Sequence, residues 1–238
     1  MSMEKHDRWR QQQKSGAAML QKQLKAKWTL EELIDNQLKR FQAHYNEEMV
    51  ITQPEDVSQL LMPKWTPPLE MACMSWLGDW RPTAILELLQ SLARSSYLSP
   101  SLADSPETDR MISKLIRETR IEEAIIDEEM AEIQATCILH LPFISAKRTD
   151  TSSVASVQSE LKKVKQVIIK GQQLRLKVLE LIVKKVLSQV DAAEFLVVFA
   201  GIQDSIHQFA AQQSLHKGPV KCPKRQTYTI YWNGGSIR

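Results

Sequence analysis

The chain has 238 residues, 43% hydrophobic and 25% charged, an ordinary composition for a globular protein that excludes a fibrous or fully disordered chain. The formal net charge of +3 is too small to indicate nucleic-acid binding by itself. Seven glycines are too few for an architecture of strands and tight turns, so we expect an all-α protein.

Apolar periodicity and proline positions divide the chain into helices. In chain order, they predict helices over 9–27, 28–50, 55–62, 67–77, 82–94, 107–141, 157–190 and 191–209. Thr29 and Asp191 are placed to cap the second and last helices, and Gly78 is placed to end the fourth. The sequence therefore predicts a multi-helix bundle.

Changes in composition along the chain predict the boundaries of the domain, its linker and its tail. Residues 1–216 form one predicted helical domain, with a mobile Ser- and Thr-rich linker at about 145–156. Residues 217–238 form a basic tail without acidic residues, which we expect to be flexible. The helix over 157–190 has two apolar stripes, so it is expected to lie between neighbours or to form a homodimer.

The cysteines and the apolar runs indicate a cellular compartment. Cys73, Cys137 and Cys222 lie far apart and form no CxxC pair, which is typical of free thiols in a reducing compartment. The first residues lack the apolar stretch of a secretory signal, and the most apolar run, 195–202, is too short to span a bilayer. We expect a nuclear or cytoplasmic protein that does not insert into a membrane.

The sequence does not favour an enzyme or a resident cofactor. It has no nucleophile elbow, no phosphate-binding glycine loop and no dinucleotide fingerprint. His207 could be considered as a heme ligand, but the positions one helical turn away hold Gln203 and Ala211. We therefore expect His207 to be a buried or interfacial histidine, and we expect no cofactor.

An acidic run on the helix over 107–141 could indicate a metal site. The run consists of Glu118, Glu122, Glu123, Asp127, Glu128, Glu129 and Glu132. Carboxylate-bridged metal sites in bundles combine Glu-x-x-His motifs, and none of the five histidines has a glutamate three residues before it. We interpret the run as a solvated acidic face and expect no metal.

The helix over 157–190 is basic, which is typical of calmodulin targets and membrane surfaces. Its cationic residues are Lys162, Lys163, Lys165, Lys170, Arg175, Lys177, Lys184 and Lys185. The alternative is a core helix whose lysines face water or the acidic helix, and its length and double stripe favour that alternative. The N-terminal segment is also basic, but no leucine zipper follows it, so direct sequence-specific DNA binding is not expected.

Three segments together resemble a known plant family. They are Phe41-Gln42-Ala43-His44-Tyr45, then Asp56-Val57 with Leu60-Leu61, and then Trp65 with Trp76-Leu77-Gly78-Asp79-Trp80-Arg81-Pro82. This combination resembles the seed-dormancy-control domain of delay-of-germination proteins and of the C-terminal half of TGA transcription factors. The segment from Gln172 to Leu179 is similar to the family signature ADxLRxxTL, and the resemblance extends over residues 7–212. Members commonly have Gly-Gly where this chain has Gly78-Asp79.

The resemblance implies a regulatory interaction module without catalysis, linked to dormancy, abscisic-acid signalling, stress or transcription. It implies partners such as a phosphatase, calmodulin or a zipper transcription factor. The motif residues that it marks as structural or partner-binding are His44, Tyr45, Trp65, Trp76, Gly78, Trp80 and Arg81. Two alternatives stay open: a transcription-associated protein that acts at DNA through a leucine-zipper partner, and a small-ligand or heme sensor.

Overall fold

The computed structural model of the chain confirms the predicted all-α fold. It describes residues 3–23, 30–49, 54–95, 97–99, 105–140 and 151–216. The elements are α1 (Met3–Gln23), α2 (Leu30–Met49), α3 (Pro54–Leu61), α4 (Pro68–Met74), β1 (Ser75–Trp76), β2 (Asp79–Trp80), α5 (Pro82–Arg94), α7 (Pro106–His140), α8 (Thr151–Leu181), the π-helical turn η2 (Ile182–Val186) and α9 (Gln189–His216).

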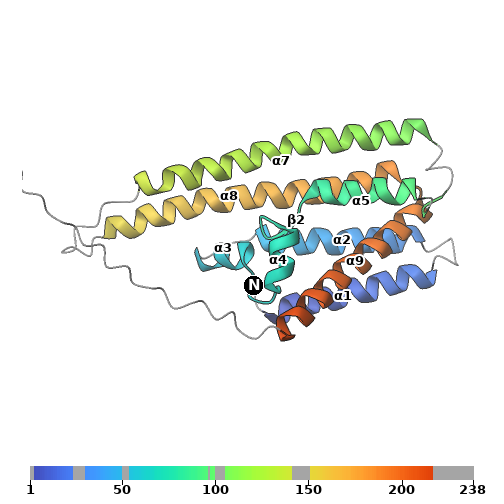
Figure 1. Cartoon of the computed structure of the whole chain (residues 1–238), viewed down its shortest axis with the longest axis horizontal. Helices are drawn as coiled ribbons and strands as arrows, with labels where there is room; N and C mark the ends of the chain where they lie inside the picture. Colours follow the sequence, from blue (N-terminus) through green and yellow to red (C-terminus); the bar gives the residue numbers. More distant parts are fainter. Residues whose placement is uncertain are drawn as a thin grey trace, which may run out of the picture.

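The two longest helices, α7 and α8, run side by side along one edge of the bundle (Figure 1). Helix α5 packs on both of them, and α2 packs on the other side of α8. Helices α1 and α9 cross each other at the opposite edge from α7, and α4 rests on α9. No helix within the described residues combines the length and the hydropathy that a membrane span needs.

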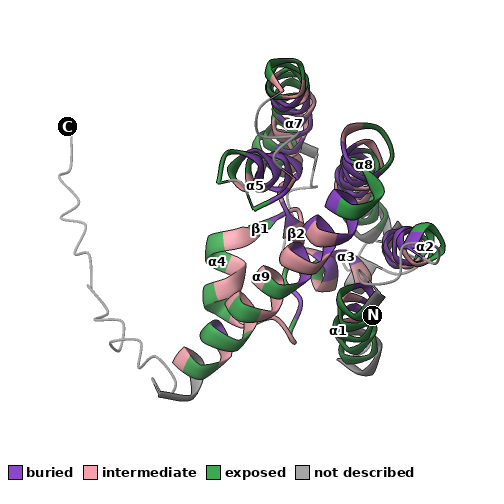
Figure 2. Ribbon diagram, turned by 90° about the vertical axis from the view of Figure 1, so that its right-hand side faces the viewer, coloured by how far each residue is buried: buried purple, intermediate pink, exposed green. Residues whose placement is uncertain are grey.

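One apolar core is shared by the long helices. Phe41, Leu86, Ile116, Leu179 and Phe199, which come from α2, α5, α7, α8 and α9, belong to the same buried cluster. Figure 2 shows the consequence: the inner sides of α2, α5 and α8 are buried, while the outer sides of α1 and α7 are exposed. The apolar side of each of these helices therefore faces one common core.

Helix α8 has the sandwiched position that its two apolar stripes predict. Ile168, Leu179 and Val178, which come from both stripes, are 0–2% exposed. The helix contacts α7, α2, α5 and α3. An apolar surface on two sides of one helix is stable in water only when neighbours cover both sides.

Helix α8 also corrects two predicted boundaries. It begins at Thr151, so 151–156 is helical instead of being linker, in keeping with the preference of Ser and Thr for helix starts. Residues 141–150, the tail 217–238 and Thr29 lie outside the described residues. The π-helical turn η2 ends the helical segment at Val186, four residues before the predicted end.

The start of α9 differs from the prediction, because Ser188 is the capping residue and Asp191 is not. Ser188 Oγ accepts a hydrogen bond from the Asp191 backbone N at 3.3 Å and donates one to Asp191 Oδ2 at 2.6 Å. The first bond is that of an N-cap, and the second joins the two side chains, whereas in a capping box the acidic side chain binds the backbone N of the capping residue. The buried Asp191 carboxylate also accepts hydrogen bonds from Ser99 N at 2.8 Å and Ser99 Oγ at 3.0 Å, which ties the segment after α5 to α9.

A short hairpin replaces the end of the predicted helix over 67–77. Helix α4 ends at Met74, and β1 pairs with β2 in antiparallel register, with Trp76 opposite Asp79. The two turn residues have positive φ, 49° at Leu77 and 93° at Gly78. Two-residue hairpin turns favour this backbone shape, which glycine adopts without strain. Gly78 thus permits the expected reversal, but within a hairpin.

Position 78 requires glycine for a second reason besides its positive φ, because the backbone of α3 lies very close to it. A Cβ atom at this position would collide with the backbone carbonyl oxygen of Leu60 in α3. Gly201 on α9 is a suitable control, because a Cβ there would meet no atom within 4 Å. Of these two glycines, only Gly78 is required by its surroundings.

We expect Gly78→Ala to lower the free energy of unfolding by about 2–4 kcal/mol, because the substitution combines a strained φ with a backbone collision. Gly201→Ala should raise it by about 0.5–1 kcal/mol, because alanine is the better helix former. Urea denaturation of the two variants measures both effects. Equal stabilities for the two variants would contradict this role of Gly78.

Candidate functional site

The hairpin is held from one side by a buried arginine. Arg175 on α8 is 0% exposed. Its Nε donates to the carbonyl oxygen of Trp80 at 2.6 Å, and its Nη2 donates to the carbonyl oxygens of Trp76 and, at 3.1 Å, Asp79. Its Nη1 donates to Gln172 Oε1 at 2.7 Å. The guanidinium exchanges its hydration for backbone carbonyls, which is how a buried charge becomes tolerable.

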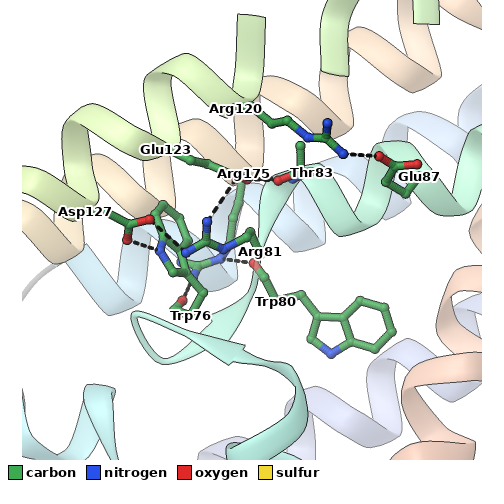
Figure 3. Close-up of polar contacts among 9 residues, drawn as sticks. All are labelled: Trp76, Trp80, Arg81, Thr83, Glu87, Arg120, Glu123, Asp127 and Arg175. Carbon is green, nitrogen blue, oxygen red and sulfur yellow. Dashed lines mark hydrogen bonds and ion pairs between the residues drawn. The ribbon is translucent and has the colours of Figure 1, made fainter. Parts of the chain in front are cut away.

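From the other side the hairpin is held by acidic residues of α7 (Figure 3). Asp127 Oδ1 accepts a hydrogen bond from Trp76 Nε1 at 2.6 Å, and Asp127 Oδ2 accepts one from Arg81 Nη2 at 2.8 Å. Glu123, which is 2% exposed, accepts hydrogen bonds from Thr83 N at 2.7 Å and from the Thr83 hydroxyl. The hairpin and the start of α5 are therefore fastened to α7.

Trp76 lies where these two sets of contacts meet. The guanidinium carbons of Arg81 and Arg175 are 5.0 Å and 5.2 Å from the centre of its ring. A guanidinium over an indole face is attracted by the ring's electrons, and the attraction is strengthened where water is excluded. We call Trp76, Trp80, Arg81 and Arg175 the hairpin anchor.

The acidic run on α7 is therefore only partly the solvated face that its sequence predicts. Glu118, Glu128 and Glu132 are exposed, as expected. Glu123 is buried because the backbone and side chain of Thr83 and the guanidinium of Arg81 satisfy it. Among the described residues no group of acidic, histidine or cysteine side chains is arranged to hold a metal ion.

The basic residues of α8 and its neighbouring turn have three different environments. Arg175 belongs to the hairpin anchor and is inaccessible. Lys170 pairs with Glu129 at 2.5 Å and Lys177 pairs with Glu122 at 2.6 Å, so the basic helix packs on the acidic helix as expected. Lys163 pairs with Glu160 of its own helix, Lys165 is half-buried, and the exposed residues Lys162, Lys184 and Lys185 complete the set.

A cavity of about 110 Å³ lies on the side of the hairpin that faces α1, α2 and α9. The structure brings five of the seven family-motif residues to its wall: His44, Tyr45, Trp65, Gly78 and Trp80. The other two, Trp76 and Arg81, contact α7 instead. The motif residues thus form two groups, one around the cavity and one on the α7 side of the hairpin.

Behind the cavity the aromatic rings pack on one another. The indole of Trp80 meets the ring of Phe199 edge-on, with centroids 5.4 Å apart, and Phe41 lies 6.2 Å from Phe199. Trp9 on α1 stacks on His44 with centroids 3.9 Å apart and an interplanar angle of 5°. Such pairs add stabilisation beyond the apolar area that they bury.

His44 is held in its neutral form. Burial among apolar groups, with a smaller contribution from the positive charge of Arg175, lowers the pKa of His44 from 6.5 to about 3. The imidazole therefore contributes a flat, uncharged surface at neutral pH.

Two carboxylates at the cavity wall, Glu70 and Asp204, bind side chains of other helices. Glu70 on α4 binds Arg10 on α1 at 3.1 Å and His207 Nδ1 on α9 at 2.6 Å. Lys14 on α1 binds Asp204 on α9 at 2.8 Å. Burial lowers the pKa of Arg10, and the charges of Glu70 and Asp204 oppose this effect. His207 is thus the interfacial histidine that its sequence context predicts.

A groove of about 610 Å³ runs between α1 and α2 on the far side of the Trp9–His44 pair. Its wall includes the exposed Met19 and the half-buried Leu33. Three cations, Arg8, Lys39 and Arg40, line it together with the acidic Glu47. The groove is both apolar and positively charged.

Sequence reasoning did not assign a role to several residues of this region. Trp9, Arg10, Gln13 and Glu70 line the cavity, yet they lie on helices whose apolar stripe is weak or short. The aromatic Trp9 in an otherwise polar helix was a usable signal, because a large exposed indole is unusual in a peripheral helix.

Comparison with known proteins agrees with the resemblance seen in the sequence. Residues 12–91 match the family described as seed dormancy control. The matched segment includes the second half of α1, then α2, α3, α4, the hairpin and most of α5. It contains most of the cavity and groove walls, but not Arg8, Trp9, Arg10 or the wall residues of α9. Arg175, Glu123 and Asp127 lie outside it. A search of curated proteins gives no match.

The depressed pKa of His44 predicts a loss of stability in acid. The unfolded chain binds a proton at this residue below about pH 6.5 and the folded chain does so only near pH 3, so stability falls as the pH falls through this window. At pH 5 the loss from His44 is about 2 kcal/mol. Urea denaturation at pH 7 and pH 5 should show this extra loss in the natural chain and not in His44→Gln. Equal losses in the two proteins would contradict the buried neutral imidazole.

Proposed function

Because residues 12–91 match the seed dormancy control family, we propose that the chain is a non-enzymatic regulatory module of plant cells that acts by binding other proteins. Dormancy, abscisic-acid signalling, stress response or transcription is the process in which it acts. Its place of action is the nucleus, the cytoplasm or both.

The observation that supports binding of a protein is the groove between α1 and α2. It lies mostly within the matched segment and presents exposed apolar surface beside cations. Apolar grooves on helical proteins commonly receive an amphipathic helix, and a charged rim selects a partner of opposite sign. Arg8, Lys39 and Arg40 favour a partner with acidic residues beside its apolar stripe.

The groove is a better partner surface than the basic helix. A calmodulin target must offer an apolar face, and the apolar faces of α8 are covered by α7, α2 and α5. Calmodulin binding through α8 would need this helix to leave the bundle and Arg175 to leave its carbonyls. We therefore propose that a phosphatase, calmodulin or a zipper transcription factor binds at the groove, with homodimer formation as the alternative use of this surface.

The second candidate function is action at DNA through a leucine-zipper partner. It uses the same groove, because a zipper factor is itself an amphipathic helical partner. Heme sensing is less favoured, because His207 is engaged with Glu70 and has Gln203 and Ala211 one turn away.

Affinity capture from plant extract, in calcium and in chelator, tests the proposal. Reversing two groove charges with Arg8→Glu and Lys39→Glu should reduce recovery of a phosphatase, calmodulin or a zipper factor by about tenfold or more. Both residues are exposed, so the fold should be kept. The readout is quantitative mass spectrometry of the captured proteins.

The matched control is Arg117→Glu, which reverses an exposed charge on α7 at the opposite edge of the bundle (Figure 1). It should leave the recovery unchanged. Recovery that Arg117→Glu reduces as much as the groove variant would show nonspecific charge attraction. Recovery of none of the three partner classes would refute the proposal.

A further inference from the structure

The cavity beside the hairpin contains a polar group without a partner. Gln13 on α1 is 7% exposed and lines the cavity. Its Oε1 accepts a hydrogen bond from Gln37 Nε2 at 2.5 Å. Its own Nε2 is buried and finds no hydrogen-bond acceptor among the described residues. A buried donor without an acceptor is costly, and a bound molecule that brings an acceptor removes this cost.

The walls around this donor suit an aromatic ring. Trp9, Phe41, His44, Tyr45, Trp65 and Trp80 all line the cavity. The parallel Trp9–His44 pair offers a flat wall, and the edge-on contact with Phe199 fixes the indole of Trp80, which also lines the cavity. Aromatic rings bind well between such surfaces by offset stacking and edge contacts.

The size of the cavity limits the occupant. Its volume of about 110 Å³ is partly open to solvent. A closed apolar cavity of about 150 Å³ in another protein holds benzene. One ring with a small substituent therefore fits, whereas a fused system as large as a porphyrin does not.

Charge further restricts the class of ligand. The cations at the wall are engaged, Arg10 with Glu70 and Lys14 with Asp204. The Asp79 carboxylate is also engaged, because its Oδ1 accepts a hydrogen bond from the Trp80 backbone N at 2.7 Å. His44 is neutral at physiological pH. A charged ligand would have to displace one of these pairs, so an uncharged molecule is favoured.

We propose that this cavity binds an uncharged, single-ring aromatic molecule, with a carbonyl oxygen that accepts a hydrogen bond from Gln13 Nε2. The site is separate from the proposed groove, although Trp9 and His44 form a wall of both. The proposal does not depend on which protein binds the groove.

Benzamide is a suitable probe, because it combines one ring with one carbonyl. For a molecule of its size we expect a dissociation constant of about 1 mM, measured by saturation-transfer NMR and by tryptophan fluorescence. Gln13→Leu, which removes the donor and keeps the shape, should weaken binding about tenfold. Gln11→Leu, an exposed neighbour on α1, is the matched control and should not change it.

A second variant keeps the test decisive if Gln13→Leu does not fold. Ala200 on α9 lines the cavity, and Ala200→Leu should fill part of it and abolish benzamide binding. Cyclohexanecarboxamide, which has the carbonyl but a puckered ring, should bind at least about fivefold more weakly than benzamide.

Three results would overturn the proposal. One is the absence of benzamide binding to the natural chain, and another is benzamide binding that neither Gln13→Leu nor Ala200→Leu changes. The third is tighter binding of benzylammonium or of N-acetylphenylalaninamide than of benzamide. Tighter binding of the latter would assign the cavity to an aromatic side chain of a partner protein.

Discussion

A single guanidinium inside the bundle fixes the relation between the longest buried helix and the hairpin. Arg175 enters the hairpin from α8 and binds three of its backbone carbonyls, those of Trp76, Asp79 and Trp80. A buried cation in an apolar core costs several kcal/mol, and this cost is offset only when its donors are satisfied with good geometry. A two-strand hairpin turn presents carbonyls close together, so its conformation and the buried arginine require each other.

The anchor orients two tryptophans in different directions. Trp76 points to Asp127 on α7 and helps to fasten the hairpin to the acidic helix. Trp80 points to Phe199 on α9 and forms part of the cavity wall. The same turn thus joins the α7–α8 side of the bundle to the α1–α2–α9 side. A cavity wall that is set by a buried charge and by backbone hydrogen bonds is pre-organised, which lowers the entropic cost of binding.

Local patterns in the sequence were sufficient to predict the position of most of the helices. Apolar spacing located α2, α5 and α7 within one or two residues, because each buries one continuous stripe. They were insufficient at the start of α9, where Ser188 caps the helix and the Asp191 carboxylate binds Ser99, a residue far away in the sequence. The hairpin was missed because its turn has leucine and glycine, whereas the usual signal is asparagine and glycine.

The candidate site could not be predicted from local patterns, because its contacts join residues that are far apart in the chain. Arg175 was grouped with the surface cations because its neighbours in sequence are lysines, and its partner Trp80 is 95 residues away. Glu123 was assigned to a solvated face for the same reason, since Thr83 is 40 residues away. The resemblance marked both the tryptophan block and the segment around Arg175. The structure adds that these two segments bind each other directly.

The central claim is that Arg175 supports the hairpin, and its removal tests this claim most directly. Arg175→Met keeps the apolar part of the side chain but leaves the carbonyls unpaired, so urea denaturation should show a loss of about 3–5 kcal/mol. Lys170→Met, which removes an exposed cation from the same helix and breaks its pair with Glu129, should cost less than about 1 kcal/mol. A loss in Arg175→Met no larger than that in Lys170→Met would contradict the account.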